Sequence, residues 1–249
     1  MISVRKVIKN SLRKFGYEIK LIDWTRTPKL EASKSDFCRT SSFIVKKHFE
    51  QTKETVDFLN EKYKRPVFGQ VPILKLLKLL SECIGPSDIG LGGVSQLTHV
   101  LQVLDAMEKD GINDRDLLIA ALVHDLGKLL LLTDEAPENV ICFNTPIGLY
   151  ENGIGLDQCY FQWNHDEFVY LRLKNYLPKH IAWLIRYHSI VIAKSEVYMN
   201  EKDKEYCERY LKLFQKYDQE TKTPYFIPSK KIEDYKSLIE EYFPKTILF

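Results

Sequence analysis

Cysteine is scarce and shows no pattern in this chain of 249 residues. The five cysteines are widely separated and none of them forms a C-x-x-C pair, which argues against a cysteine-ligated zinc site. An odd number of scattered cysteines also argues against a framework of disulfides and favours reduced thiols. We therefore expect a cytoplasmic protein.

Long apolar runs and an excess of charge of one sign are also missing. No apolar stretch reaches the roughly 18–20 residues of a membrane-spanning helix, and the first residues lack the apolar core of a signal peptide. The formal net charge is only +2, so nothing in the composition indicates a nucleic-acid partner. With 45% hydrophobic and 28% charged residues, the chain suits a globular fold.

Apolar residues at spacings of three and four are frequent, which is typical of amphipathic helices. The windows with this pattern are residues 51–63, 71–82, 95–111, 114–132, 164–177, 178–189, 201–222 and 232–243. Alternating strand patterns are few, and residues 138–145 are the best short candidate. The sequence therefore predicts an all-α fold, a helical bundle.

The first 36 residues differ from the rest. Residues 4–17 form a short basic amphipathic stretch, and residues 25–36 have the composition of a linker. We expect residues 1–36 to be an arm and linker, and residues 37–249 to be the functional domain. Residues 4–17 could touch a membrane surface or a partner, but a helical arm packed on its own domain or on a second copy is the simpler interpretation. The oligomeric state is left open.

The stretch "LLIAALVHDLGKLLLL", residues 117–132, is apolar apart from a His-Asp pair, a Gly and a Lys. Lys128 lies four residues after His124 and three residues after Asp125, so all three can point to one side of a helix. Burying an imidazole, a carboxylate and an ammonium is costly unless each has a partner. A metal ion is the candidate partner.

Other His and Asp residues could complete such a site. They lie on inward-facing stripes or at the ends of different helical windows: His99, His124, Asp125, His165, His188 and Asp218. Helical bundles build metal sites from facing helices in this way. Imidazole and carboxylate ligands suit iron, manganese or zinc, and the residue types do not separate iron from manganese. His48 and His180 are interpreted as core histidines.

The order H…HD…D, together with "LTHVLQVLDAM", "FQWNHDEFVYLRLKNYLP", "IAWLIRYHS" and "FQKYDQETK", resembles the myo-inositol oxygenase family, the non-haem di-iron branch of the HD-domain superfamily. The resemblance covers roughly residues 37–249. It implies two irons with Asp125 as the bridge. One iron would be bound by His99, His124, Asp125 and Asp218, and the other by Asp125, His165 and His188.

The resemblance also implies an activity. A mixed-valent Fe(II)/Fe(III) pair would use O2 to cleave the ring of myo-inositol, giving D-glucuronate. Asp125 and Lys128 would be catalytic, with Lys128 favouring an alkoxide of the bound hydroxyl. The matching substrate-binding positions are Arg39, Lys128, Ser189 and Lys222.

Two segments depart from the family pattern, residues 81–95 and residues 140–149. They replace acidic substrate-binding segments, so another cyclitol or an inositol derivative stays open as the substrate. A di-metal HD-domain phosphohydrolase is the alternative function, and a non-catalytic binding protein is a third. An oxygenase would consume O2 with a cyclitol, whereas a phosphohydrolase would release phosphate without O2.

Overall fold

The chain is described here by a computed structural model for residues 42–84, 94–140 and 143–249. Within these residues the structure is mostly helical, which confirms the all-α prediction. The α-helices are α3 (Lys53–Lys62), α4 (Ile73–Leu79), α5 (Gln96–Lys109), α6 (Arg115–Val123), α7 (His165–Leu173), α8 (Lys179–Tyr187), α9 (Ile192–Ser195), α10 (Glu201–Tyr206), α11 (Lys212–Glu220) and α12 (Lys236–Tyr242). The expected arm and linker, residues 1–36, and the expected boundary at residue 37 lie outside the described residues.

Shorter elements connect these helices. The 3₁₀ segments are η1 (Leu80–Glu82), η3 (His124–Leu132), η4 (Pro137–Asn139), η5 (Leu156–Gln158), η6 (Glu196–Tyr198) and η8 (Ile232–Tyr235), and η7 (Cys207–Leu211) is a π-helical turn. Strands β1 (Gln70–Val71) and β2 (Ile247–Leu248) pair antiparallel. The strand candidate at 138–145 does not form in its described residues. Its first part belongs to the turn η4, where Pro137 occupies the first position, and Asn144 makes only an isolated bridge to Ile190.

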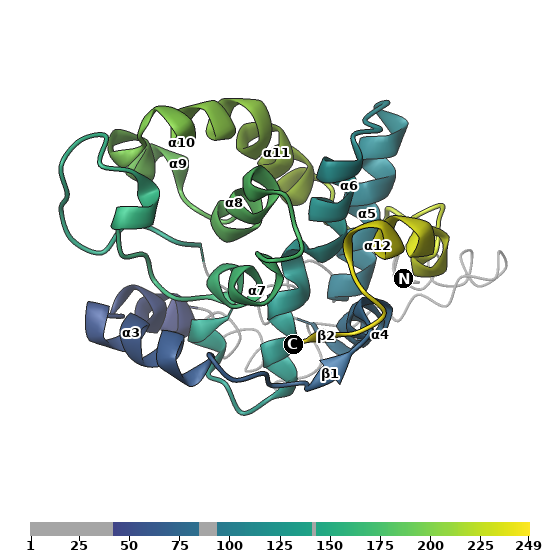
Figure 1. Ribbon diagram of the computed structural model, residues 1–249, viewed down its shortest axis with the longest axis horizontal. Helices are drawn as coiled ribbons and strands as arrows, with labels where there is room; N and C mark the ends of the chain where they lie inside the picture. Colours follow the sequence, from purple (N-terminus) through teal and green to yellow (C-terminus); the bar gives the residue numbers. More distant parts are fainter. Residues whose placement is uncertain (1–41, 85–93, 141–142) are drawn as a thin grey trace, which may run out of the picture. The chain divides into compact units, whose positions relative to one another are not determined.

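The core is formed where α5, α6, η3, α7, α8 and α11 meet. α7 packs on η3 and on α8, while α5 packs on α6 and α11 (Figure 1). Leu104, Ile119, Phe168, Leu184 and Phe214, one from each of these five α-helices, are fully buried. Burying one apolar face of each helix in a common core stabilises the bundle and directs the polar residues of those faces into its interior.

The window 114–132 forms two successive helices instead of one. α6 ends at Val123, and η3 continues as a 3₁₀ helix from His124. Residues three apart in a 3₁₀ helix lie above one another, so Lys128 stacks on Asp125 and their charged atoms are 2.8 Å apart. The tighter turn also brings Gly127 against α7: a Cβ added there would meet the His165 carbonyl oxygen at 2.2 Å. Glycine is therefore required for this close approach.

Candidate metal centre

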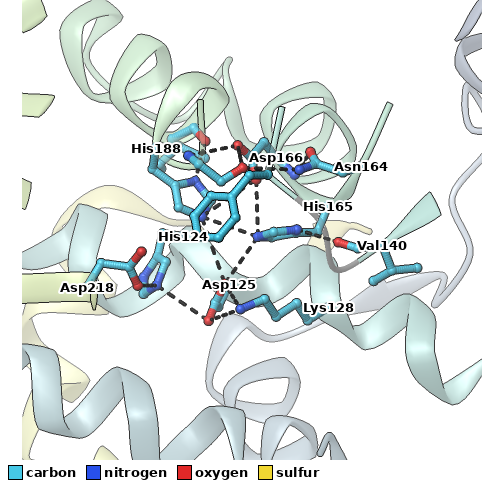
Figure 2. A network of polar contacts seen from close by, with 12 residues as sticks. His124, Asp125, Lys128, Val140, Asn164, His165, Asp166, His188 and Asp218 are labelled. Atoms are coloured by element: carbon cyan, nitrogen blue, oxygen red, sulfur yellow. Dashed lines mark hydrogen bonds and ion pairs between the residues drawn. The ribbon is translucent and has the colours of Figure 1, made fainter. Parts of the chain in front are cut away.

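Buried His and Asp side chains gather in two groups that share Asp125 (Figure 2). The first group is His99, His124 and Asp125, and the second is Asp125, His165 and His188. In each group the potential ligand atoms lie within 4.8 Å of one another. These residues come from α5, η3, α7 and the end of α8. The interior of the bundle thus contains two adjoining groups of side chains of the kind that can hold a metal ion.

The carboxylate of Asp125 lies between the two groups. Its Oδ2 is 3.7 Å from Nε2 of His99 and 3.5 Å from Nε2 of His124. Its Oδ1 is 3.3 Å from Nε2 of His165 and 3.9 Å from Nε2 of His188. Because one oxygen faces each group, a single carboxylate can contribute a ligand atom to both.

Asp218, from α11, adjoins the first group. Its Oδ1 is 2.8 Å from Nε2 of His99 and 3.3 Å from Nε2 of His124. All six side chains expected from the sequence are therefore brought together in one buried cluster, although positions 99 and 218 are 119 residues apart. That they bind metal stays a prediction.

Three of the four imidazoles are oriented by backbone carbonyls. Each donates its Nδ1–H to a carbonyl oxygen: His124 to Ala121 at 2.9 Å, His165 to Val140 at 2.5 Å, and His188 to Ile185 at 2.8 Å. A carbonyl only accepts, so a neutral ring carries its proton on Nδ1 and presents the lone pair of Nε2, as metal-binding histidines do. Burial lowers the pKa of His99 and His188, which favours the neutral ring.

The carboxylates of the cluster are held ionised. Burial alone would raise the pKa of Asp125, but the Lys128 ammonium and the His124 imidazole outweigh it and hold that pKa well below its usual range. Burial is likewise outweighed at Asp218, where hydrogen bonds from His124 and His99 keep the pKa well below its usual range. Burial lowers the pKa of His124, yet Asp125 and Asp218 raise it overall.

The buried polar atoms of the cluster fit metal ions. Oδ1 of Asp125 lies 2.8 Å from Nζ of Lys128, and Nε2 of His124 lies 3.3 Å from Oδ1 of Asp218, so these atoms contact only charged or imidazole groups of the cluster itself. Burying a carboxylate is costly unless nearby positive charge offsets it. Cations bound at these atoms would offset the negative charge of the carboxylates.

Three of the four expected substrate-binding residues lie within the described part of the chain. The Nζ atoms of Lys128 and Lys222 lie 3.2 Å and 3.4 Å from Oε1 of Gln96, so two ammonium groups converge beside the cluster. Ser189 lies next to His188, and its hydroxyl donates to Oδ2 of Asp166 at 2.5 Å. Arg39 lies outside the described residues.

Asp166 was not expected from the sequence. It is fully buried, and its Oδ1 lies 3.1 Å from Nε2 of His165 and 3.6 Å from Nε2 of His188. Its Oδ2 accepts from the backbone N–H and the hydroxyl of Ser189. Asp166 thus ties the start of α7 to the residue after His188. The signal was present, since "HD" at 165–166 repeats the dipeptide at 124–125.

The remaining histidines lie outside the cluster. Both ring nitrogens of His48 face backbone carbonyls, those of Glu138 and Phe143, at 2.8 Å and 3.0 Å. His180 pairs with Asp116 and stacks on an aromatic ring. Of the two segments that depart from the family pattern, residues 85–93 and 141–142 lie outside the described residues.

Comparison with known proteins adds an independent observation. The family model described as "Myo-inositol oxygenase" matches residues 38–142 and 133–249. "Probable inositol oxygenase" of Oryza sativa subsp. japonica is 33% identical over 237 residues, which cover 79% of this chain and 76% of that protein. "Inositol oxygenase 1" of Arabidopsis thaliana is 30% identical over 240 residues (80% and 76%), and "Inositol oxygenase" of Danio rerio is 25% identical over 234 residues (78% and 84%).

Proposed function

The chain belongs to the myo-inositol oxygenase family, and from this premise we propose that it cleaves the ring of myo-inositol, or of a closely related cyclitol, with O2 at a di-iron centre. The product would be D-glucuronate or its counterpart. The observation that carries the proposal is the shared carboxylate: Asp125 has one oxygen toward each of two groups of buried imidazoles. The relatives named above are oxygenases, so the phosphohydrolase remains only as an outcome of the experiment below.

The proposed ligands divide between the two irons as the distances suggest. His99, His124 and Asp218 would hold one iron, His165 and His188 the other, and Asp125 would bridge them. A mixed-valent pair of irons, when bound, would coordinate hydroxyls of the cyclitol and supply electrons to O2. The protein contributes a buried site, which excludes bulk water, and imidazoles fixed in one orientation by backbone carbonyls.

Lys128 is proposed as the residue that promotes loss of a proton from the substrate. Its ammonium lies 2.8 Å from the Asp125 carboxylate and is only 14% exposed in the side chain. A cation next to a substrate hydroxyl lowers the pKa of that hydroxyl, and low exposure limits the screening of this effect by water. The same ammonium also donates to Oε1 of Gln96 at 3.2 Å, and this contact helps to hold it beside the bridging carboxylate.

Lys222, Ser189 and Arg39 are proposed as further substrate contacts. Lys222 shares the oxygen of Gln96 with Lys128, which places its ammonium at the same edge of the cluster. A second ammonium there can donate to a ring hydroxyl. The hydroxyl of Ser189 donates to Asp166 and accepts from Asn164, so it can only accept further from a substrate.

The decisive experiment measures metal content and O2 uptake together on partly reduced protein. Myo-inositol and a panel of other cyclitols are offered in turn. Two irons per chain, with O2 uptake and glucuronate formed from myo-inositol, are the expected result. Uptake with another ring only would keep the reaction and change the substrate. Two metals with phosphate release and no O2 uptake would identify the phosphohydrolase.

Lys128→Ala is expected to retain both metal ions and to lower kcat by about 10²–10³, because a preorganised charge next to the reacting group is removed. Metal content and O2 uptake are measured on the same preparation. Lys174→Ala, which removes an exposed lysine of the C-terminal end of α7, is the control. An unchanged kcat would remove Lys128 from the mechanism.

Ser189→Ala is expected to raise KM about threefold to tenfold, with metal content unchanged, because one hydrogen bond to the substrate is lost. Steady-state O2 uptake at varied cyclitol concentration gives KM and kcat separately. A drop in metal content at unaltered KM would assign the hydroxyl to holding Asp166 instead.

We also propose a cytoplasmic location. Cys83, Cys159 and Cys207 carry free thiols, as is usual in a reducing compartment. Among the described residues, no helix combines the length and apolar character needed to cross a membrane.

A further inference from the structure

A separate cavity lies beside the two segments that carry His165 and His188. Its volume is about 250 Å³, and its walls come from α3, from residues 157–163, from the start of α7 and from the end of α8. The side chains and backbone that line it include none of the six proposed metal ligands. This volume exceeds that of a ~150 Å³ cavity that accepts a six-carbon ring. The space therefore suits a six-membered ring with substituents.

Aromatic and amide side chains form much of the lining. Tyr160, Phe161, Trp163 and Tyr187 supply aromatic surface, on which the C–H face of a saturated ring can pack. Asn144 also lines the cavity. It is 3% exposed, and its Oδ1 has no hydrogen-bond partner among the described residues. A buried amide oxygen without a partner is costly, and a hydroxyl donated by a ligand would satisfy it.

The charges in the wall exclude an anion. Arg186 is the cation of the lining, and it already donates to Glu167 at 2.6 Å and to Asp157 at 2.6 Å. Tyr187 donates to the same oxygen of Asp157 at 2.8 Å. With its donors directed at these carboxylates, Arg186 does not offer an anion an unopposed positive charge, and the acidic side chains would repel it.

A buried organic cation is also disfavoured. Glu167 is held by two hydrogen bonds from Arg186, and Asp157 and Asp57 are exposed at the edge of the cavity, where water screens their charges. A cation in the interior would meet the neutral amide of Asn144, and it would lose its hydration without gaining an ion pair. Neutral hydroxyls meet neither the repulsion that an anion meets nor the uncompensated loss of hydration that a cation suffers. They donate to the amide and carboxylate oxygens and accept from amide N–H groups.

We propose that this cavity is a second binding site, for a neutral polyhydroxylated ring of the size of a cyclitol or a monosaccharide. The ligand packs against the aromatic side chains and donates a hydroxyl hydrogen bond to Asn144. This assignment follows from the cavity lining and does not depend on the proposed oxygenase reaction. Free cyclitols and free sugars share this chemistry.

The test is calorimetric titration of the metal-loaded protein with myo-inositol, and separately with glucose, under anaerobic conditions that prevent turnover. The expected result is two myo-inositol molecules per chain, one at the metal centre and one in the cavity. Val56→Phe fills the cavity from α3 and is expected to reduce this to one. Asn144→Leu is expected to weaken binding in the cavity about fivefold to tenfold, the effect of one hydrogen bond. Asn113→Leu, an exposed substitution outside the cavity, is the control.

The outcomes separate this proposal from the oxygenase proposal. If the oxygenase proposal fails and the cavity proposal holds, one myo-inositol still binds, and Val56→Phe abolishes that binding. If the cavity proposal fails, binding is the same in the wild type, Val56→Phe and Asn144→Leu, while O2 uptake persists. The cavity proposal is also overturned if neither myo-inositol nor glucose binds in the cavity, while tetramethylammonium or D-glucuronate binds there saturably and Val56→Phe abolishes that binding. Comparing the affinities for glucose and for myo-inositol shows whether the cavity prefers a sugar or a cyclitol.

Discussion

Asp125→Ala is expected to lose both metal ions and, with them, all turnover. Asp125 is fully buried, and its two oxygens face different groups of imidazoles. Its removal therefore takes one ligand from each proposed iron site and deletes the charge that balances Lys128. Loss of an outer partner of a ligand already costs about 10–100-fold in metal affinity, so loss of a shared ligand should cost more. Metal analysis after gel filtration measures this directly.

Two further variants show whether the expected loss of metal is specific to the Asp125 carboxylate. Asp125→Asn preserves the size of the side chain and should also lose the metals, which separates the lost charge from the lost volume. Asp116→Ala changes an aspartate of α6 that pairs with His180 outside the cluster, and it should retain both ions. Thermal melts of all three variants show whether the chain is folded. Two ions per folded chain in Asp125→Ala would refute the bridging assignment.

Gly127→Ala is expected to destabilise the fold and to weaken the second metal group, although position 127 carries no ligand. The new methyl group would lie 2.2 Å from the His165 carbonyl oxygen, which belongs to the backbone and cannot rotate away. This clash is relieved only if α7 moves away from η3, and His165 then moves with α7. Overpacking of this kind costs about 1–3 kcal/mol, which corresponds to a fall in Tm of about 2–12 °C for a protein of this size. Affinity for the second metal should fall about tenfold or more.

Gly111→Ala is the matched control for this effect. Gly111 has a φ of +80°, but a Cβ there would meet nothing within 4 Å. It should lower stability by about 1–2 kcal/mol through backbone strain alone and should leave metal affinity unchanged. If Gly127→Ala binds both metals with the affinity of the wild type, the contact between η3 and α7 does not position His165.

Helical periodicity predicted most of the bundle because amphipathic spacing is a local property of the chain. It did not predict the change from α6 to the 3₁₀ helix η3 at His124, since both helices place residues three apart near one another. The pairing of β1 with β2 joins two-residue strands from distant parts of the chain. Strands this short have no alternation that a sequence pattern can detect.

For the candidate metal centre, too, the sequence predicted some features and missed others. The motifs around His124, His165 and His188 identified the family, which the comparisons confirm. The same residues are close together in the structure, and their metal-binding roles stay predictions. Gln96 was missed because its role comes from contacts with residues remote in the chain, such as Lys222. The second HD dipeptide marked Asp166, but it did not show that this carboxylate holds Ser189.

The sequence by itself determined the helical class, the family and the kinds of side chain available to a metal, because these depend on residue type and on spacing along one helix. The tertiary structure decided which oxygen of Asp125 faces which imidazoles, and which nitrogen of His165 points inward. It also formed the cavity beside α3 from segments about 100 residues apart in the chain. Such features depend on how helices pack and on where each backbone carbonyl lies, and no local pattern encodes either.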